Sequence, residues 1–294
     1  MYVISNKEYT GNNTLEIDIQ DYKDDTIVIE GCYFHDLDKD CDGLRINNDV
    51  PNQHRQLPPR SYPSTKVKVR NCLFTNAGHP GDQADELASV VRGATAVFER
   101  CCFENNGKAV LLSTGDAVDI EGDMQHLSAF FQNCIFWRCS RRNILAQCNF
   151  YAEMLNCLVE SWGWNFHEKS YGARSSDHGK LCVRNSLFYQ EDFLSCIFRD
   201  VLKGSLLMDM FRNSFPWHPG FMRAGTTDNG GTMLWDHNYC NRWWLTHPKH
   251  VDKPMNKDVA EDLYEHLLQT VLIAVHENMT MRFGAPSIEK IFDL

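Results

Sequence analysis

Six ionisable side chains of this chain have the types and spacing to combine into a reactive site. They are Asp40, Asp42, Asp82, Asp85, Lys108 and Arg142. Carboxylate oxygens are the ligands that a hard divalent cation such as calcium prefers, and lysine and arginine offer positive charge to an anionic substrate. A single aspartate at a turn is more often there because its side chain bonds its own backbone. The chemistry therefore depends on which elements bring the six together.

Other reactive patterns are less well supported. The Gly-x-Ser-x-Gly sequence of many hydrolases is absent, and there is no pair of Cys-x-x-Cys motifs to hold a structural zinc ion. The histidines near the C-terminal aromatic residues show no metal-site spacing apart from a loose His247 and His250. Nucleophilic hydrolysis and zinc binding are thus not expected.

A short phrase recurs along most of the chain and indicates the element that carries these residues. Each copy is an alternating apolar run that ends in Asn or an equivalent, followed by Cys or Ser and then an aromatic residue two positions on. The copies are spaced unevenly, about 20 to 40 residues apart, as in a solenoid whose coils share one strand and differ in loop length. Cysteines mark five copies: Cys32, Cys72, Cys102, Cys134 and Cys157.

The alternation has a period of two and is rich in Val, Ile, Phe and Tyr, which is typical of a strand with one buried face. Copies lie a whole coil apart and are not joined by Asn-Gly hairpins, so like strands are expected to stack in parallel. The sequence therefore predicts an all-β parallel β-helix. Stacking at about 4.8 Å also predicts an asparagine ladder and a thiol ladder.

The chain contains 12 cysteines, which we interpret as small buried hydrophobic residues of an internal stack. Disulfides between neighbouring coils are the alternative. The first residues lack the basic and apolar regions of a signal peptide. We therefore expect a cytoplasmic protein or one assembled into a particle, with secretion by another route left open.

Composition excludes several classes of protein. A formal net charge of -10 with no basic block argues against nucleic-acid binding, and no apolar run approaches the length of a membrane span. With 294 residues, 43% of them hydrophobic, the chain is long enough for a substantial core. We expect a parallel β-helix over residues 1–250 and a C-terminal helix and tail over residues 251–294.

Near the C-terminus the period changes from two to about four. An amphipathic helix is predicted there, with Asn256 or Asp258 as its N-cap. Because the open end of a β-helix exposes unpaired backbone and apolar core, we expect this helix to cap the C-terminal end of the coils. Docking on another subunit is the alternative. The apolar positions are Val259, Leu263, Leu267, Val271 and Val275.

Five segments of the middle of the chain carry a resemblance to a known family: residues 40–46, 81–95, 106–116, 136–147 and 154–164. In order and approximate spacing they resemble the calcium strands, the lysine strand, the arginine motif and the following coil of the pectate lyase family of polysaccharide lyases. The resemblance covers residues 26–189. It implies a right-handed parallel β-helix of the pectin lyase-like type.

The resemblance implies calcium-assisted β-elimination on an acidic polysaccharide such as polygalacturonate, or binding of such a polysaccharide by a carbohydrate-binding descendant of the family. Asp40, Asp42 and Asp85 match the family's calcium ligands, and Asp82 lies close to where another acidic ligand is expected, while Gly81 occupies that ligand's position. A divalent cation on the uronate carboxylate acidifies the neighbouring proton and stabilises the enolate.

Two basic residues match the family's remaining functional positions. Arg142 aligns with the catalytic arginine base, and Lys108 aligns with the lysine that binds substrate and supplies positive charge to the uronate. The family's arginine motif continues with a proline and a second arginine, where this chain has Ile144 and Gln147. Gln147 is thus expected at a substrate-binding position without the arginine charge.

Two further functions stay open. The fold could serve as a structural or adhesion protein without chemistry, for example a virus or phage particle subunit, as a homo-oligomer or in a larger assembly. Other β-helix enzymes hydrolyse pectin with paired aspartates, for which Asp82 and Asp85 are candidates. The aromatic C-terminal region favours a core or cap role over sugar stacking; it contains Trp217, Trp235, Trp243 and Trp244, with His218, His237, His247 and His250 nearby.

Overall fold

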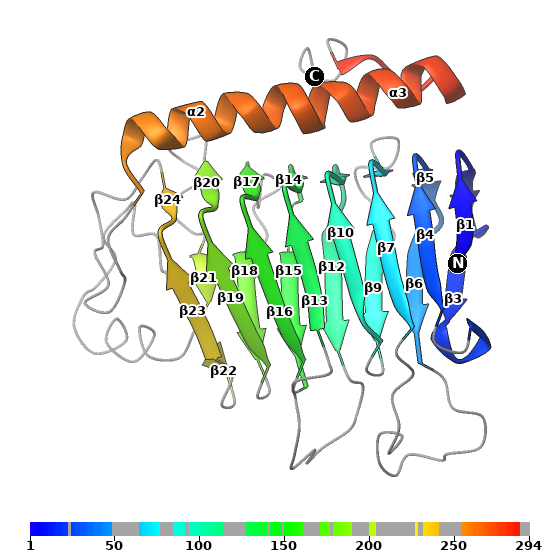
Figure 1. Ribbon diagram of the computed structural model, residues 1–294, viewed down its shortest axis with the longest axis horizontal. Coiled ribbons are helices and arrows are strands. Elements are labelled where there is room, and N and C mark those ends of the chain that lie inside the picture. Colours follow the sequence, from blue (N-terminus) through cyan, green and yellow to red (C-terminus); the bar gives the residue numbers. More distant parts are fainter. Residues whose placement is uncertain are drawn as a thin grey trace.

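Three parallel β-sheets run along the molecule, and each coil from β1 to β18 adds one strand to each sheet (Figure 1). This arrangement fits the predicted parallel β-helix. The computed structural model describes residues 1–22, 25–48, 65–76, 85–91, 94–113, 128–139, 142–148, 150–160, 171–176, 179–189, 200–203, 227–228, 232–240 and 255–288.

The strands of each sheet follow one another in coil order. Sheet A contains β1 (Tyr2–Ser5), β4 (Thr26–Glu30), β7 (Lys66–Arg70), β10 (Ala96–Glu99), β13 (Ser128–Gln132), β16 (Tyr151–Leu155), β19 (Lys180–Arg184) and β23 (Thr232–Asp236). Sheet B contains β2 (Glu8–Gly11), β5 (Tyr33–Leu37), β8 (Leu73–Thr75), β11 (Cys102–Glu104), β14 (Ile135–Trp137), β17 (Leu158–Glu160), β20 (Leu187–Tyr189) and β24 (Tyr239–Cys240).

Sheet C completes each coil. It contains β3 (Leu15–Asp18), β6 (Leu44–Asn47), β9 (Ala88–Val91), β12 (Lys108–Ser113), β15 (Arg142–Gln147), β18 (Tyr171–Ser176) and β21 (Asp200–Lys203), and β22 (Thr227–Asp228) also pairs with β18. A short 3-10 helix, η1 (Ile19–Tyr22), follows β3.

The corner between sheets A and B explains the asparagine of the repeated phrase. The corner asparagines Asn71, Asn133, Asn156 and Asn185 have φ angles from +44° to +52°, a left-handed conformation that asparagine tolerates better than most residues. The Asn133 N–H donates to the Leu155 carbonyl of the next coil at 3.1 Å. The Asn71 side chain bonds Glu30 and Arg100 instead of an asparagine. The coils on either side of Asn71 carry Gly31 and Arg100 at this corner, so the predicted side-chain asparagine ladder is not formed there, and the left-handed backbone is what the corner residues share.

The predicted thiol ladder is confirmed in the core. Cys32, Cys72, Cys101, Cys134 and Cys157 are fully buried, and their thiols donate to carbonyls of the preceding coil, as Cys134 does to Phe98 O at 3.5 Å. Cys101 occupies this column, whereas Cys102 lies in the second apolar cluster, outside the coil core. The cysteines of the described residues are free thiols, as the interpretation of small buried hydrophobic residues requires.

The aromatic residue two positions after the cysteine forms a second column in the core. The rings of Phe34, Phe74, Phe103 and Phe136 are stacked, with successive centroids 4.4, 4.8 and 5.1 Å apart. These distances follow the spacing of the coils, about 4.8 Å. The repeated phrase therefore encodes one corner and two core columns.

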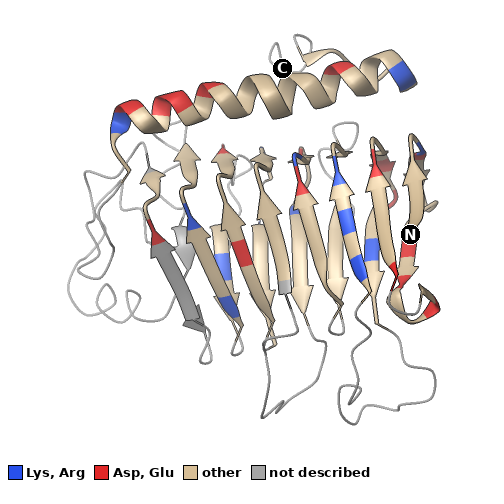
Figure 2. Ribbon diagram, in the orientation of Figure 1, with Lys and Arg blue, Asp and Glu red and all other residues tan. Residues whose placement is uncertain are grey.

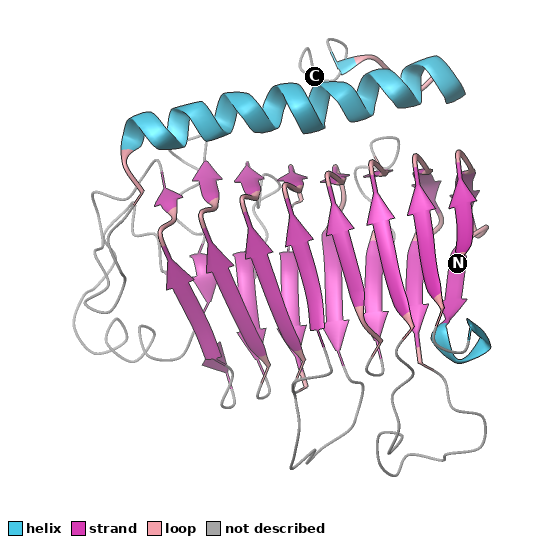
Figure 3. Cartoon of the chain, viewed as in Figure 1, coloured by secondary structure: helices cyan, strands magenta, loops and turns pink. Residues whose placement is uncertain are grey.

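A long helix follows the coils and is continuous through three parts: α2 (Lys257–Leu267), the π-helical turn η5 (Leu268–Ile273) and α3 (Ala274–Phe283) (Figure 3). Asn256 is the N-cap, as one of the two predicted candidates, and its side chain accepts from the Asp258 N–H at 2.8 Å. Gly284 ends the helix with a φ of +69°, where a residue without Cβ is favoured.

The helix lies along the outer face of sheet B. At one end the Met255 N–H donates to the Asn238 carbonyl of the last described coil at 3.1 Å, and at the other end the Phe283 ring lies 6.0 Å from that of Tyr33 in β5. The helix therefore follows the flank of the stack, and the expected cap across its C-terminal end is wrong. Its apolar stripe (Ala260, Leu267, Val271, Leu272, Val275, Met279) packs on Tyr33, Leu73, Cys102, Ile135, Trp137, Leu158 and Leu187.

The physical reason for this position is that the strands of sheet B from β5 to β20 present a continuous apolar column on their outer face, to which β14 contributes both Ile135 and Trp137. The helix is roughly 40 Å long, and the eight strands of sheet B span roughly 34 Å. An amphipathic helix of this length buries more apolar surface along the flank than across one coil. Its solvent-facing side is acidic at α2 (Figure 2), where Asp258, Glu261, Asp262 and Glu265 are exposed.

Candidate functional site

The strand register of sheet C aligns ionisable residues from four consecutive coils. Asp42 and Glu86 each stand two residues before the paired residues Leu44 and Ala88. Ala88 pairs with Val110 of β12, so Lys108 has the same register position as Glu86. Lys108 in turn pairs with Arg142 at the start of β15. Neighbouring coils thus place two acids and then two bases in one row.

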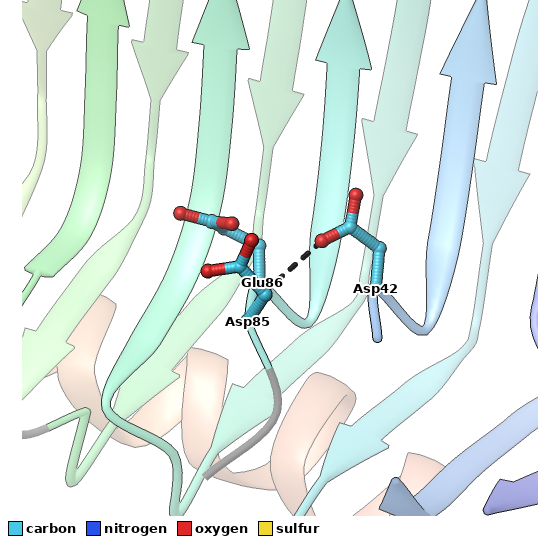
Figure 4. A group of neighbouring side chains, drawn as sticks. All are labelled: Asp42, Asp85 and Glu86. Carbon is cyan, nitrogen blue, oxygen red and sulfur yellow. Dashed lines mark hydrogen bonds between the residues drawn. The ribbon is translucent and has the colours of Figure 1, made fainter. Parts of the chain in front are cut away.

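Three carboxylates gather at the acidic end of this row. Ligand oxygens of Asp42, Asp85 and Glu86 all lie within 4.8 Å of one another (Figure 4). The Asp42 carboxylate is fixed by the Glu86 N–H at 3.2 Å and by the Ser89 hydroxyl at 2.6 Å. Arg45 Nη1 lies 3.7 Å from Asp42 Oδ2, the oxygen that also accepts from Ser89. Backbone and strand contacts therefore position Asp42 independently of any ligand.

Two cations contact the same carboxylates. Lys108 Nζ donates a hydrogen bond to Asp85 and lies 3.7 Å from Glu86 Oε1. The Arg142 guanidinium reaches Glu86 Oε1 at 3.4 Å. We refer to Asp42, Asp85, Glu86, Lys108 and Arg142 as the sheet C cluster. Arg45 lies beside the cluster, 3.7 Å from Asp42 and 3.7 Å from Glu16, so three carboxylates face three basic groups, one of which is shared with a further acid.

The three acids differ in pKa because they differ in burial and in their contacts with Lys108 and Arg142. Glu86 is 3% exposed, and burial raises its pKa to about 7 against the opposing charges of Arg142 and Lys108. Burial also raises the pKa of Asp42. For Asp85 burial acts in the same direction, but the hydrogen bond and charge of Lys108 outweigh it and leave its pKa below the ordinary value. Asp85 is thus the acid held most firmly in the charged form.

The acidic part of the cluster fits a calcium ion in ligand chemistry, since it offers only carboxylate oxygens on strand ends. The fit requires exchange of partners. Lys108 already bonds Asp85, and Arg142 already pairs with Glu86. A bound cation would take carboxylates that now pair with these two side chains, so cation binding and release of Lys108 and Arg142 are coupled.

Of the sequence-predicted metal ligands, Asp42 and Asp85 enter the three-carboxylate group. Asp40 is exposed, lies in the turn before β6 and has a φ of +64°, a conformation typical of a turn aspartate. It is not a member of the group of three. Asp82 lies outside the described residues.

Lys108 and Arg142 come together as the resemblance implies, whereas Gln147 does not join them. Gln147 ends β15, the strand that Arg142 begins, so the two residues are roughly 17 Å apart along the strand. Its side-chain amide lies 3.5 Å from the Ser113 hydroxyl. A substrate contact at Gln147 would therefore belong to a different part of the sheet from the cluster.

Sequence reasoning missed Glu86, the most buried member of the cluster. The available signal was its position directly after Asp85 and before the apolar strand β9. Register with Lys108 and Arg142 becomes visible only once β9, β12 and β15 are aligned. Glu86 lies two residues before the start of its strand, at the position where the following coils carry basic residues. A search for that pattern would have identified it.

The C-terminal aromatic region contributes little to this site in the described residues. Trp217, Trp243, Trp244, His218, His247 and His250 lie outside them, and Trp235 is part of β23. His237 is exposed at a corner with a φ of +51°, the position that asparagine fills in other coils.

The sequence matches no known protein-family model, and no significant match was found among curated proteins. None of the helices in the part of the chain that the structure describes has the length and apolar character needed to cross a bilayer.

Proposed function

We propose that this chain is a divergent pectate lyase-like protein, a right-handed parallel β-helix that binds an acidic polysaccharide at the sheet C cluster and cleaves it by β-elimination. The observation that carries the proposal is the alignment of Asp42, Glu86, Lys108 and Arg142 at one register position of consecutive coils. The right-handed turn follows the strong general preference of crossovers between parallel strands.

The cluster has groups for each part of the reaction. Calcium held by Asp42, Asp85 and Glu86 would supply charge that acidifies the proton next to the uronate carboxylate. Lys108 would exchange its hydrogen bond to Asp85 for one to the uronate. Arg142 would leave Glu86, release a proton to solvent and then take the proton from the carbon next to the uronate carboxylate. The electrons of that C–H bond would form the C=C bond as the glycosidic C–O bond breaks, and the departing sugar oxygen would take a proton from water.

The pairing of opposite charges in the cluster favours joint binding of cation and substrate. Its three carboxylates face Lys108, Arg142 and Arg45, so a divalent cation alone or a polyanion alone would leave uncompensated charge beside the buried Glu86. A uronate chain with its calcium counter-ions brings both charges together. Calcium affinity should therefore be low without the polysaccharide and rise in its presence.

The test is incubation with polygalacturonate with and without calcium, following the absorbance of the unsaturated product. Arg142→Lys keeps the charge but removes the guanidinium, and should abolish product formation while leaving calcium-dependent binding to immobilised polygalacturonate. Lys203→Arg, on the last strand of sheet C, is the control. Binding without product in the unmodified protein would reduce the proposal to a carbohydrate-binding protein, and absence of both would refute it.

A second candidate function is favoured by the ion pairs themselves. Because Lys108 and Arg142 already bond Asp85 and Glu86, the cluster also serves as a link between coils of a non-enzymatic scaffold, such as a structural or adhesion subunit of a virus or phage particle. On this reading the protein acts in the cytoplasm or in a particle as a homo-oligomer. Arg142→Lys would then change stability and leave polygalacturonate untouched.

A further inference from the structure

Two buried glutamates of sheet B contact the long helix. Glu160 at the end of β17 accepts from the Tyr264 hydroxyl at 3.1 and 3.3 Å. Glu104 at the end of β11 lies 3.2 Å from His276 Nε2 in α3. Both glutamates stand at one register position of sheet B, two coils apart. The apolar helix interface is therefore crossed by polar contacts toward both of its ends.

The His276–Glu104 contact is the more deeply buried of the two. The side chains are 2% and 1% exposed. Their other polar atoms, His276 Nδ1 and Glu104 Oε1, have no hydrogen-bond partner within the described part of the chain. A buried pair with a single bond depends strongly on charge, because loss of either charge leaves the other one buried without compensation.

Among the groups around the pair, Glu104 is the one that compensates a positive charge on His276. From β5, Tyr33 faces the interface with His35 stacked on it. Cys102, Cys139 and Tyr33 have raised pKa values, with burial as the main cause in each and the charge of Glu104 contributing. Arg138 is engaged with the face of Trp137, and Glu277 and Arg282 of the helix are exposed.

We propose that the His276–Glu104 pair is a pH-sensitive latch that holds the C-terminal helix on the coils while His276 is protonated and loosens it in alkaline solution. Loosening would uncover the apolar column of sheet B, including Tyr33, Ile135 and Trp137, which are 5%, 1% and 2% exposed beneath the helix. The latch is separate from the sheet C cluster and does not depend on its chemistry.

The direction of the pH effect on helix docking follows from the contacts of His276. Burial lowers the pKa of His276, but the charge and hydrogen bond of Glu104 outweigh it and leave the pKa raised. A histidine whose folded-state pKa is raised contributes stability that is fully present below the unfolded value of about 6.5 and is lost as pH rises through the folded value. Helix docking is therefore tighter below about pH 6.5 and weakens as pH rises through the raised folded-state pKa of His276.

The experiment is amide hydrogen exchange of peptides from α2 and α3, expressed as protection factors corrected for the intrinsic effect of pH, between about pH 6 and about pH 9. Protection of the helix should fall by roughly tenfold for each unit by which the His276 pKa exceeds its unfolded value. Peptides from β13 report whether the coils themselves remain folded.

Glu104→Gln keeps the shape of the pair but removes the charge that raises the pKa, so burial alone would act on His276 and the trend with pH should flatten or reverse. The double variant Glu104→Gln with His276→Gln removes both charges, so its helix protection should not change with pH even if the variant is less stable. Glu160→Gln is the matched control and should retain the trend of the unmodified protein. Equal helix protection at both pH values, or an unchanged trend in Glu104→Gln, would overturn the latch.

Discussion

Replacement of Glu86 by glutamine should remove a specific part of the pH dependence of stability. The carboxyl of Glu86 has a pKa of about 7 in the folded protein, against 4.5 for an unperturbed glutamate. The folded state therefore holds its proton more tightly than the unfolded state. The stability that this group contributes is complete below the unfolded value and is lost as pH rises through about 7.

The magnitude follows from the difference between the two values, which corresponds to about 3 kcal/mol of unfolding free energy. In urea titrations followed by far-UV circular dichroism, the unmodified protein should lose about this much between pH 4.5 and pH 8 through Glu86 alone. Asp42 and Asp85 also titrate, so the informative quantity is the difference between the unmodified protein and Glu86→Gln at each pH. That difference should favour the variant in alkaline solution.

The matched control is Glu261→Gln, which replaces an exposed acid of the helix that pairs with Lys257 at 3.2 Å. It should leave the pH profile unchanged. If Glu86→Gln and the unmodified protein lost the same free energy between acid and alkaline solution, burial would not be what governs Glu86. The electrostatic description of the sheet C cluster would then be wrong.

Two further predictions concern the coil itself. Phe103→Ala should destabilise the protein by about 3 to 5 kcal/mol in the same titrations, because the ring is fully buried between Phe74 and Phe136; a loss below about 1 kcal/mol would mean that the column is not tightly packed. Asn133→Ala should cost roughly 1 kcal/mol, and Asn133→Gly much less, because φ at this corner is +52°. Equal stabilities of the two Asn133 variants would contradict a backbone role.

Much of the coil could be predicted because its determinants are local. Period-two patterning sets the strands, and the cysteine and phenylalanine of the phrase reach the core because their spacing fixes which face they take. The role of Asn71 was misjudged for a physical reason. A repeated asparagine suits both a side-chain ladder and a left-handed corner, and only the backbone angle distinguishes them.

The position of the helix and the identity of Glu86 could not be predicted, because both depend on residues far apart in the sequence. The apolar column beneath the helix consists of single residues such as Leu73, Ile135 and Leu158, each from a different coil. In the sequence these look like ordinary outer positions of short strands. Glu86 likewise meets Lys108 and Arg142 only through the register of three strands.

The match in length between the helix and sheet B limits how the number of coils in this protein can change. Duplication of one coil would lengthen sheet B by about 4.8 Å, and the helix would need about three more residues to keep both ends docked. Three residues fall short of a full turn and would rotate the rest of the apolar stripe by about 60° away from the sheet. Unlike an open solenoid, in which repeats can be added singly, this chain can change its number of coils only together with a compensating change in the helix.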